Sequence, residues 1–179
     1  MKGSRPRQGA LTEGPDLSKT ADTRAVIENM VDGLNDHRID DMGEFFAENF
    51  TWFGNTGCGT KKGLREFQEN WQKPFQAAFT DKVCTDEARM FMGEWAAAFG
   101  HQKATHSGPF MGIPATGKRV TIRFMDFWKV VDGKIVDNWV MVDFPHILAQ
   151  LGKDVFDGEG WEAFDRGEKT PPTPAPEEA

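Results

Sequence analysis

The segment from Arg123 to Phe144 constrains the fold more than any other part of this chain. It reads RFMDFWKVVDGKIVDNWVMVDF, two runs rich in β-branched and aromatic residues on either side of an Asp-Gly pair. Asp-Gly between two such runs is a strong local signal for a β-hairpin. The sequence therefore predicts a hairpin with strands over 118–131 and 134–144.

Two turn geometries fit the Asp-Gly pair, and they place different residues opposite one another. A two-residue turn pairs Val131 with Lys134, whereas a type I turn with a bulge at Gly133 pairs Val130 with Lys134. Burial of one face normally determines the register. We prefer the bulged turn, because it separates an apolar face from a charged one. The charged face would carry Arg123, Lys129, Asp137 and Asp143, and the apolar face Ile122, Phe124, Asp126, Trp128, Val130, Val136, Asn138, Val140, Val142 and Phe144.

Asp126 is the unexpected member of the apolar face. The preferred register sets it directly across from Asn138. It is either a structural carboxylate satisfied by Asn138, a histidine or backbone donors, or a functional one. Burial raises the pKa of a carboxyl group, so that it can both take and return a proton near neutral pH. Asp126 is therefore the candidate proton carrier, with the structural role as the alternative. Asp143, before Phe144-Pro145, is expected to cap a short helix.

The remaining periodicities predict helices first and strands after them. One apolar stripe has helical spacing from Ala21 onward, a shorter helix is expected next, and a third stripe is bent or ended by Pro74. The three sets are Val26, Ile27, Met30, Val31 and Leu34; then Met42, Phe45 and Phe46; then Leu64, Phe67, Trp71 and Phe75. A short strand is expected over 50–54, and two antiparallel strands over 82–106 with a break near Gly93. This order indicates an α+β domain.

Length and composition fit one domain with flanking segments. The chain has 179 residues, which is long enough to bury a real core. We predict a mobile leader over 1–19, an α+β domain over 20–164 and a disordered tail over 165–179, where DRGEKTPPTPAPEEA combines four prolines with many charges.

Charge and cysteine content exclude several kinds of partner. A net charge of -7 argues against nucleic acid or an anionic membrane as partner. No run approaches ~20 apolar residues, and the first residues lack the apolar core of a signal peptide. Cys58 and Cys84 have no metal-type spacing and are expected to be free thiols in a reducing compartment. These features predict a cytoplasmic protein.

Three strings resemble the SnoaL-like polyketide cyclases of the nuclear-transport-factor-2-like superfamily. They are ATHSGPFMGIPATGKRV, FWKVVDGKIVDNW and DFPHILAQLG, and the resemblance runs from about Asp22 to Trp161. It implies a conical α+β barrel, in which N-terminal helices pack on a strongly curved antiparallel sheet that encloses a ligand cavity. It also implies a cofactor-free aldol ring closure on aromatic polyketide esters, with a carboxylate and a histidine as the acid/base pair.

The resemblance also assigns positions, and the chain departs from the family pattern at two of them. The family's active-site histidine before DGKI falls on Asp126. Its catalytic aspartate after DGKI falls on Val140, which cannot transfer a proton. Asp143 matches an aspartate seen beside that position, and His106 matches the histidine of the Thr-His-x-Gly string. His101 lies five residues from His106 and would project to the opposite side of a regular strand, so a shared metal site is not expected.

The leading hypothesis is an acid/base enzyme of cyclase, isomerase or dehydratase type, acting on an apolar aromatic or polyketide-like small molecule. Asp126 and His106 are the candidate catalytic residues, and no metal, nucleotide or flavin cofactor is implied. The alternative is a non-catalytic module of the same fold that binds a small molecule or serves in assembly. The candidate substrate-binding residues are Asn138, Trp52, Phe124, Trp128 and Val140. A homodimer is expected, because the outer face of the hairpin carries Met125, Phe127, Trp139 and Met141.

Overall fold

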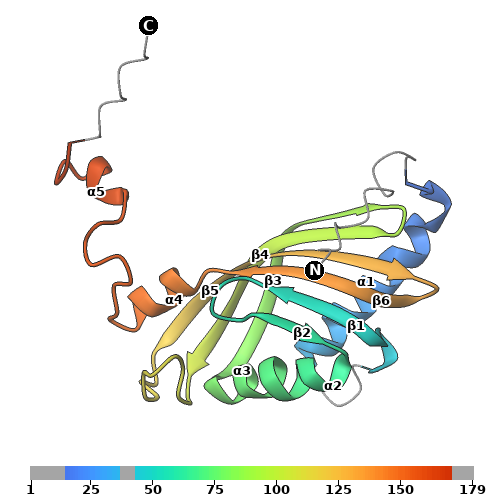
Figure 1. Cartoon of the computed structure of the whole chain (residues 1–179), viewed down its shortest axis with the longest axis horizontal. Coiled ribbons are helices and arrows are strands. Elements are labelled where there is room, and N and C mark those ends of the chain that lie inside the picture. Colours follow the sequence, from blue (N-terminus) through green and yellow to red (C-terminus); the bar gives the residue numbers. More distant parts are fainter. Residues whose placement is uncertain (1–14, 37–42, 171–179) are drawn as a thin grey trace, which may run out of the picture.

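The computed structural model describes residues 15–36 and 43–170, which form an α+β domain as predicted (Figure 1). A 3-10 helix, Leu17–Lys19, leads into α1 (Thr20–Asn35). The other elements are β1 (Phe46–Gly54), β2 (Thr60–Lys62), α2 (Leu64–Phe67), a π-helix (Gln68–Gln72), α3 (Lys73–Ala78), β3 (Phe79–Met92), β4 (Trp95–His106), β5 (Arg119–Val131), β6 (Lys134–Val142), α4 (Phe144–Gln150) and α5 (Glu162–Asp165).

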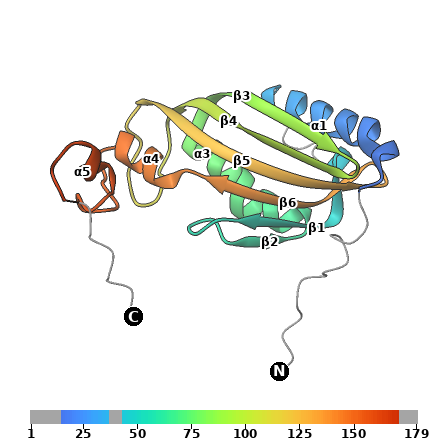
Figure 2. The same ribbon diagram turned by 90° about the horizontal axis from the view of Figure 1, so that it is seen from above.

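The strands form one sheet in the order β2-β1-β6-β5-β4-β3. The expected closed, strongly curved and purely antiparallel barrel is wrong, since β1 pairs with β6 in parallel and the sheet is open, with β2 and β3 at its edges (Figure 2). The parallel pair is possible because a long stretch of chain separates β1 from β6.

Helix α1 and the helical segments between residues 64 and 78 cover one face of the sheet. Helix α1 contacts β3 and β4, and α2 contacts β1. The predicted stripe of α1 is buried at Ile27, Met30 and Val31. The helical path of 64–78 continues through Pro74, which lies in the first turn of α3, directly after the π-helix. Because residues 64–72 are already helical, Pro74 removes one backbone hydrogen bond from the path without ending it.

The second predicted helix is wrong in the described part. Phe46 is the first residue of β1 and pairs with Ile135 of β6, and Phe45 lies in the preceding turn. Both rings are buried. Two adjacent apolar residues fit either a helix face or a turn that leads into a strand. The pairing of Phe46 with β6 favours the strand. Met42 lies outside the described residues, as do residues 1–14 of the predicted leader and 171–179 of the predicted tail.

The hairpin is present, but the preferred turn is wrong. Val131 pairs with Lys134, and Asp132 and Gly133 both have positive φ angles, of 49° and 75°. This is a two-residue turn, whose twist matches that of the flanking strands. The extra residue lies in β6 instead, at Val136, because the register shifts between the pairs Val130–Ile135 and Lys129–Asp137.

This bulge restores the predicted face. Past Val136 the observed register differs from the predicted one by two residues, and a shift of two keeps each side chain on the same side of the sheet. Asp126 therefore lies opposite Val140, not Asn138, while all three still face inward. On the outer face Lys129 lies opposite Asp137, and an Arg123 nitrogen approaches an Asp143 oxygen at 3.7 Å.

Both cysteines are free thiols, as expected. Burial raises the pKa of Cys58 and of Cys84 to about 12, so both remain protonated at neutral pH. Within residues 15–36 and 43–170, no helix has the length and apolar character needed to cross a membrane.

Asp143 caps α4, which confirms its predicted structural role. Its Oδ1 accepts a hydrogen bond from the backbone N–H of His146 at 3.0 Å, and Pro145 lies in the first turn. Such a cap satisfies one of the N–H groups that a helix start leaves unpaired.

Asp143→Ala should destabilise the protein by about 1 kcal/mol, because it removes this cap. Asp143→Asn retains an acceptor oxygen, so its free energy of unfolding should fall by only a few tenths of about 1 kcal/mol. Urea unfolding of the two variants beside wild type measures the difference. An equal loss in both variants would contradict the capping role and point to the ion pair with Arg123 instead.

Candidate functional site

A cavity of about 140 Å³ lies between the helices and the inner face of the sheet. Its walls come from α1, from the helical path 64–78 and from strands β1, β3, β4, β5 and β6, and most of them are apolar. Six of its side chains are polar: Gln72, Gln76, Lys82, Gln102, Asp126 and Asn138. A mainly apolar cavity with a few polar groups is typical of small-molecule sites.

Asp126 enters the cavity from β5 and is held by Asn138. The Asn138 Nδ2 donates to Asp126 Oδ1 at 2.9 Å and to the carbonyl of Phe127 at 3.2 Å. Burial raises the pKa of Asp126 to about 7; the Asn138 hydrogen bond lowers this pKa and the charge of Asp86 raises it. At neutral pH the carboxyl group is therefore present in both protonation states, as a general acid/base requires.

Small residues of β4 make room for Asp126 and for a neighbouring ion pair. Ala98 lies between Asp126 of β5 and Arg89 of β3 in the sheet. The Arg89 Nε donates to Asp86 Oδ2 at 2.6 Å, and Asp86 lies opposite Gly100. Because Arg89 is engaged with Asp86, its positive charge does not offset the burial of Asp126.

All five predicted substrate-binding residues line this cavity together with Asp126. They are Asn138, Trp52, Phe124, Trp128 and Val140. Trp52 stacks on Trp71 with ring centroids 4.8 Å apart, and Trp71 stacks on Phe75 at 4.7 Å, so one wall is a continuous series of rings. Val140 lies opposite Asp126 in the strand pair and places apolar surface beside the carboxyl group.

His106 is not brought together with Asp126. It ends β4, eight residues beyond Ala98, which corresponds to roughly 26 Å along the strand. It is fully buried, its Nδ1 lies 3.0 Å from Thr116 Oγ1, and burial lowers its pKa. Its backbone bonds to Gly117 and Lys118, so its surroundings are those of a residue that holds the 107–118 connection in place.

Four polar lining residues were not predicted from the sequence: Gln72, Gln76, Lys82 and Gln102. Gln72 and Gln76 are four residues apart and flank the predicted stripe, and Gln102 shares the inward parity of Ala98 and Ala104. The Lys82 Nζ donates to Gln76 Oε1 and to the carbonyl of Phe79. Burial lowers the pKa of Lys82 to about 8. The sequence signal for these residues is a polar side chain at a position that the apolar periodicity of the helix or strand turns inward.

In the described ranges, no three His, Cys, Asp or Glu side chains are grouped closely enough to hold a metal ion. His101 and His106 lie on opposite faces of β4, as predicted. His101 Nδ1 lies 3.2 Å from Glu87 Oε1 on the outer face, whereas His106 is fully buried.

The fold is an α+β domain whose helices cover one face of a sheet, with an ionisable group in an apolar cavity between them. Residues 24–151 match the model of the family described as SnoaL-like polyketide cyclase. The chain belongs to this family, which confirms the resemblance seen in the sequence.

Two curated relatives are similar over most of their length. The nogalonic acid methyl ester cyclase of Streptomyces nogalater is 30% identical over 135 residues, which is 74% of this chain and 98% of the relative. The aklanonic acid methyl ester cyclase DauD of Streptomyces sp. (strain C5) is 28% identical over 140 residues, 76% of this chain and 85% of the relative.

Solved structures share the fold. Wild-type IdmH of Streptomyces antibioticus has a TM-score of 0.64 at 25% identity, covering 73% of this chain and 99% of its own. A SnoaL-like polyketide cyclase of Agrobacterium tumefaciens has a TM-score of 0.59 at 25% identity, with 73% and 98% covered.

Asp126→Asn should stabilise the protein, and the gain should depend on pH. The folded-state pKa, about 7, lies above the ordinary 3.8. The aspartate protein therefore loses stability as the pH rises from about 4 to about 7, by up to about 4 kcal/mol. The asparagine variant has no such loss, because it keeps an acceptor for Asn138 and carries no charge.

Urea unfolding of both proteins between pH 4 and pH 8.5 measures this gain, which should grow with pH and level off above about 7. A variant less stable than wild type across the range would instead support the structural role of Asp126.

Proposed function

We propose that this protein is a cofactor-free acid/base enzyme that closes a ring in an aromatic polyketide-like substrate. The observation that carries the proposal is a carboxyl group with a pKa of about 7 on the wall of an apolar cavity. Family membership and the two methyl ester cyclases among the relatives support the reaction class. A filled core at Asp126 would have favoured the non-catalytic module. The cavity found there instead supports the enzyme.

Ring closure by an aldol step needs one group that takes a proton and returns it. The Asp126 carboxylate removes a proton from a carbon beside a carbonyl group, and an enolate forms. The enolate carbon attacks a second carbonyl carbon, so that a carbon–carbon bond forms while the carbonyl π bond breaks. The resulting alkoxide takes the proton back from Asp126. Asn138 keeps one carboxylate oxygen fixed, which leaves the other to face the substrate.

A single carboxyl group serves both roles in this proposal. The family resemblance implies a carboxylate and a histidine, but Val140 stands at the carboxylate position, and His106 lies roughly 26 Å along β4 from the level of Asp126. A group whose pKa is near the working pH is efficient as base and as acid. We therefore assign the acid/base role to Asp126 and no proton transfer to His106.

Two other functions use the same cavity. An isomerase, dehydratase or hydrolase would keep the proton transfer at Asp126 and change the product. A non-catalytic module would bind the ligand without converting it, and Val140 is the observation that favours it. The acidic charge of -7 speaks against nucleic acid or an anionic membrane as partner. The free thiols fit a cytoplasmic location.

Asp126→Asn should lower turnover by about 10²- to 10⁴-fold, the usual contribution of a positioned general base. Nogalonic acid methyl ester is the first substrate to test, with ring closure followed by chromatography. Wild-type turnover should rise with pH through about 7, as the carboxyl group of Asp126 ionises.

Asp132→Asn is the matched control, since it makes the same replacement in the exposed turn of the same hairpin, where asparagine also accepts a positive φ. Equal activity of Asp126→Asn and wild type would exclude the acid/base assignment. Ligand binding without conversion in the wild type would favour the non-catalytic module.

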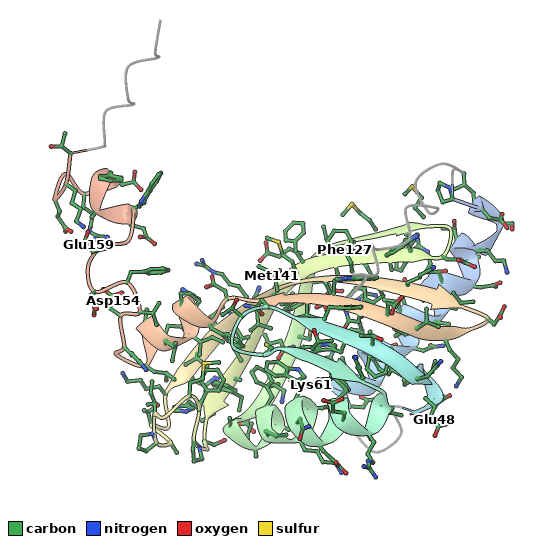
Figure 3. All side chains as sticks on the ribbon, viewed as in Figure 1. Glu48, Lys61, Phe127, Met141, Asp154 and Glu159 are labelled. Atoms are coloured by element: carbon green, nitrogen blue, oxygen red, sulfur yellow. The ribbon has the colours of Figure 1, made fainter. Side chains whose placement is uncertain are left out.

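The protein should form a homodimer through the outer face of the sheet. Figure 3 shows Phe127 and Met141 on the side of the sheet away from α2 and α3. The exposed apolar side chains of this face are Met125 (58% exposed), Phe127 (55%), Trp139 (37%) and Met141 (60%). These four side chains form two adjacent cross-strand pairs, and apolar surface gathered in this way is typical of an interface, which a two-fold axis would cover on both copies at once.

Light scattering at micromolar concentration should return about twice the monomer mass of 20.1 kDa. Phe127→Arg combined with Met141→Arg should give the monomer mass, because like charges would face each other across the axis. Trp161→Arg, at an exposed position on the C-terminal segment, should leave the dimer intact. A monomer mass for the wild type would rule out this interface.

A further inference from the structure

The cavity has a second polar region that the chemistry of Asp126 does not use. Gln72 and Gln76 lie one helical turn apart, so their side chains share a face. Lys82 comes from the start of β3 and donates to Gln76. Gln102 comes from β4, where it lies opposite Cys84, two residues along β3 from Lys82. The bond between Lys82 and Gln76 joins the helical pair to β3, and we call these four lining residues the glutamine–lysine cluster.

The cluster is separate from the acid/base group. Gln102 pairs with Ile122 of β5, whereas Asp126 pairs with Ala98. Four residues along β4 correspond to roughly 13 Å between the two levels.

The glutamines of the cluster have hydrogen-bonding groups without partners. Gln72 is 6% exposed, and neither its Oε1 nor its Nε2 has a hydrogen-bond partner in the described part of the chain. The same holds for the buried Oε1 of Gln102. Buried polar groups in folded proteins nearly always have partners, so three such atoms on the wall of one cavity require an explanation. A ligand that supplies the missing partners provides it.

We propose that the glutamine–lysine cluster recognises the hydroxylated, carbonyl-bearing end of a fused-ring aromatic ligand. Lys82 and the Gln72 amide N–H groups donate to carbonyl or hydroxyl oxygens of that end, and the Oε1 atoms of Gln72 and Gln102 accept from its hydroxyl groups. The stacked rings of Trp71 and Phe75, neighbours of Gln72 and Gln76 on the same helical path, form the apolar wall beside it.

This assignment rests on the proposed function in using the same cavity, and it adds the residues that recognise one end of the substrate. A site with buried polar groups rejects a ligand that lacks the matching groups, because those groups then stay unpaired. An oxygen-rich aromatic end at the cluster also sets which part of the substrate lies near Asp126. The cluster is thus a determinant of specificity and takes no part in proton transfer.

Two probes of nearly equal shape test the assignment. In 2,3-dihydroxynaphthalene two hydroxyl groups can donate and accept, while 2,3-dimethylnaphthalene has methyl groups in their place. Equilibrium dialysis with the full chain, with the ligand quantified by chromatography, gives both affinities. The wild type should prefer the dihydroxy probe. Gln72→Leu should lose about 10-fold in affinity for it and bind the dimethyl probe as well as, or better than, the wild type.

Gln102→Leu should change the preference in the same direction, which keeps the test open if one variant folds poorly. Asn70→Leu, exposed on the same π-helix, is the matched control and should bind both probes as the wild type does. A wild type without preference for the dihydroxy probe, or a preference unchanged in both leucine variants, overturns the assignment.

Asp126→Asn separates this proposal from the proposed function. It should lower turnover by about 10²- to 10⁴-fold and leave the probe preference unchanged. A preference lost in Gln72→Leu supports the cluster even if Asp126→Asn has full activity. A loss of turnover in Asp126→Asn with no change of preference in the leucine variants supports the enzyme and removes the cluster.

Discussion

The bulge at Val136 is the constraint on which the site depends. The tight turn at Asp132 and Gly133 pairs Val131 with Lys134, and without a later shift it would turn alternate residues of β6 the wrong way. One extra residue in β6 reverses that parity, so that Asn138, Val140 and Val142 face inward. Asn138 is then close enough to hold Asp126. The turn has the backbone geometry that Asp-Gly prefers. The bulge then allows the apolar face of β6 to be buried despite that turn.

Inward parity explains the rest of the site as well. The inner face of β4 is made of small residues around Ala98 and Gly100, and these leave space for the larger polar groups of the neighbouring strands. One of these groups, Arg89, is engaged with Asp86, and Asp126 is left beside an apolar neighbour, Val140. The high pKa of Asp126 therefore follows from the sheet as a whole, since burial is its largest cause.

Features that depend on local pattern could be predicted from the sequence, and features that depend on distant pairing could not. The hairpin, its inward face and the cap at Asp143 follow from short strings with a clear physical preference. The parallel pairing of β1 with β6 joins segments almost ninety residues apart, as Phe46 and Ile135 show, and no local pattern encodes it. Lys82 and Gln102 likewise reach one cavity from two strands, and their sequence positions alone do not indicate a common site.

Val140 leaves Asp126 without a second titratable group directly across the strand pair. A second carboxylate at this position would lie directly opposite Asp126 in the strand pair. Two carboxyl groups so close would share a proton and titrate as a pair, and the charge of one would depend on the other. A valine removes this coupling and excludes water from the same space. Asp126 is left as a single group whose pKa is set mainly by burial, and such a group can take a proton from a carbon acid and return it without a partner.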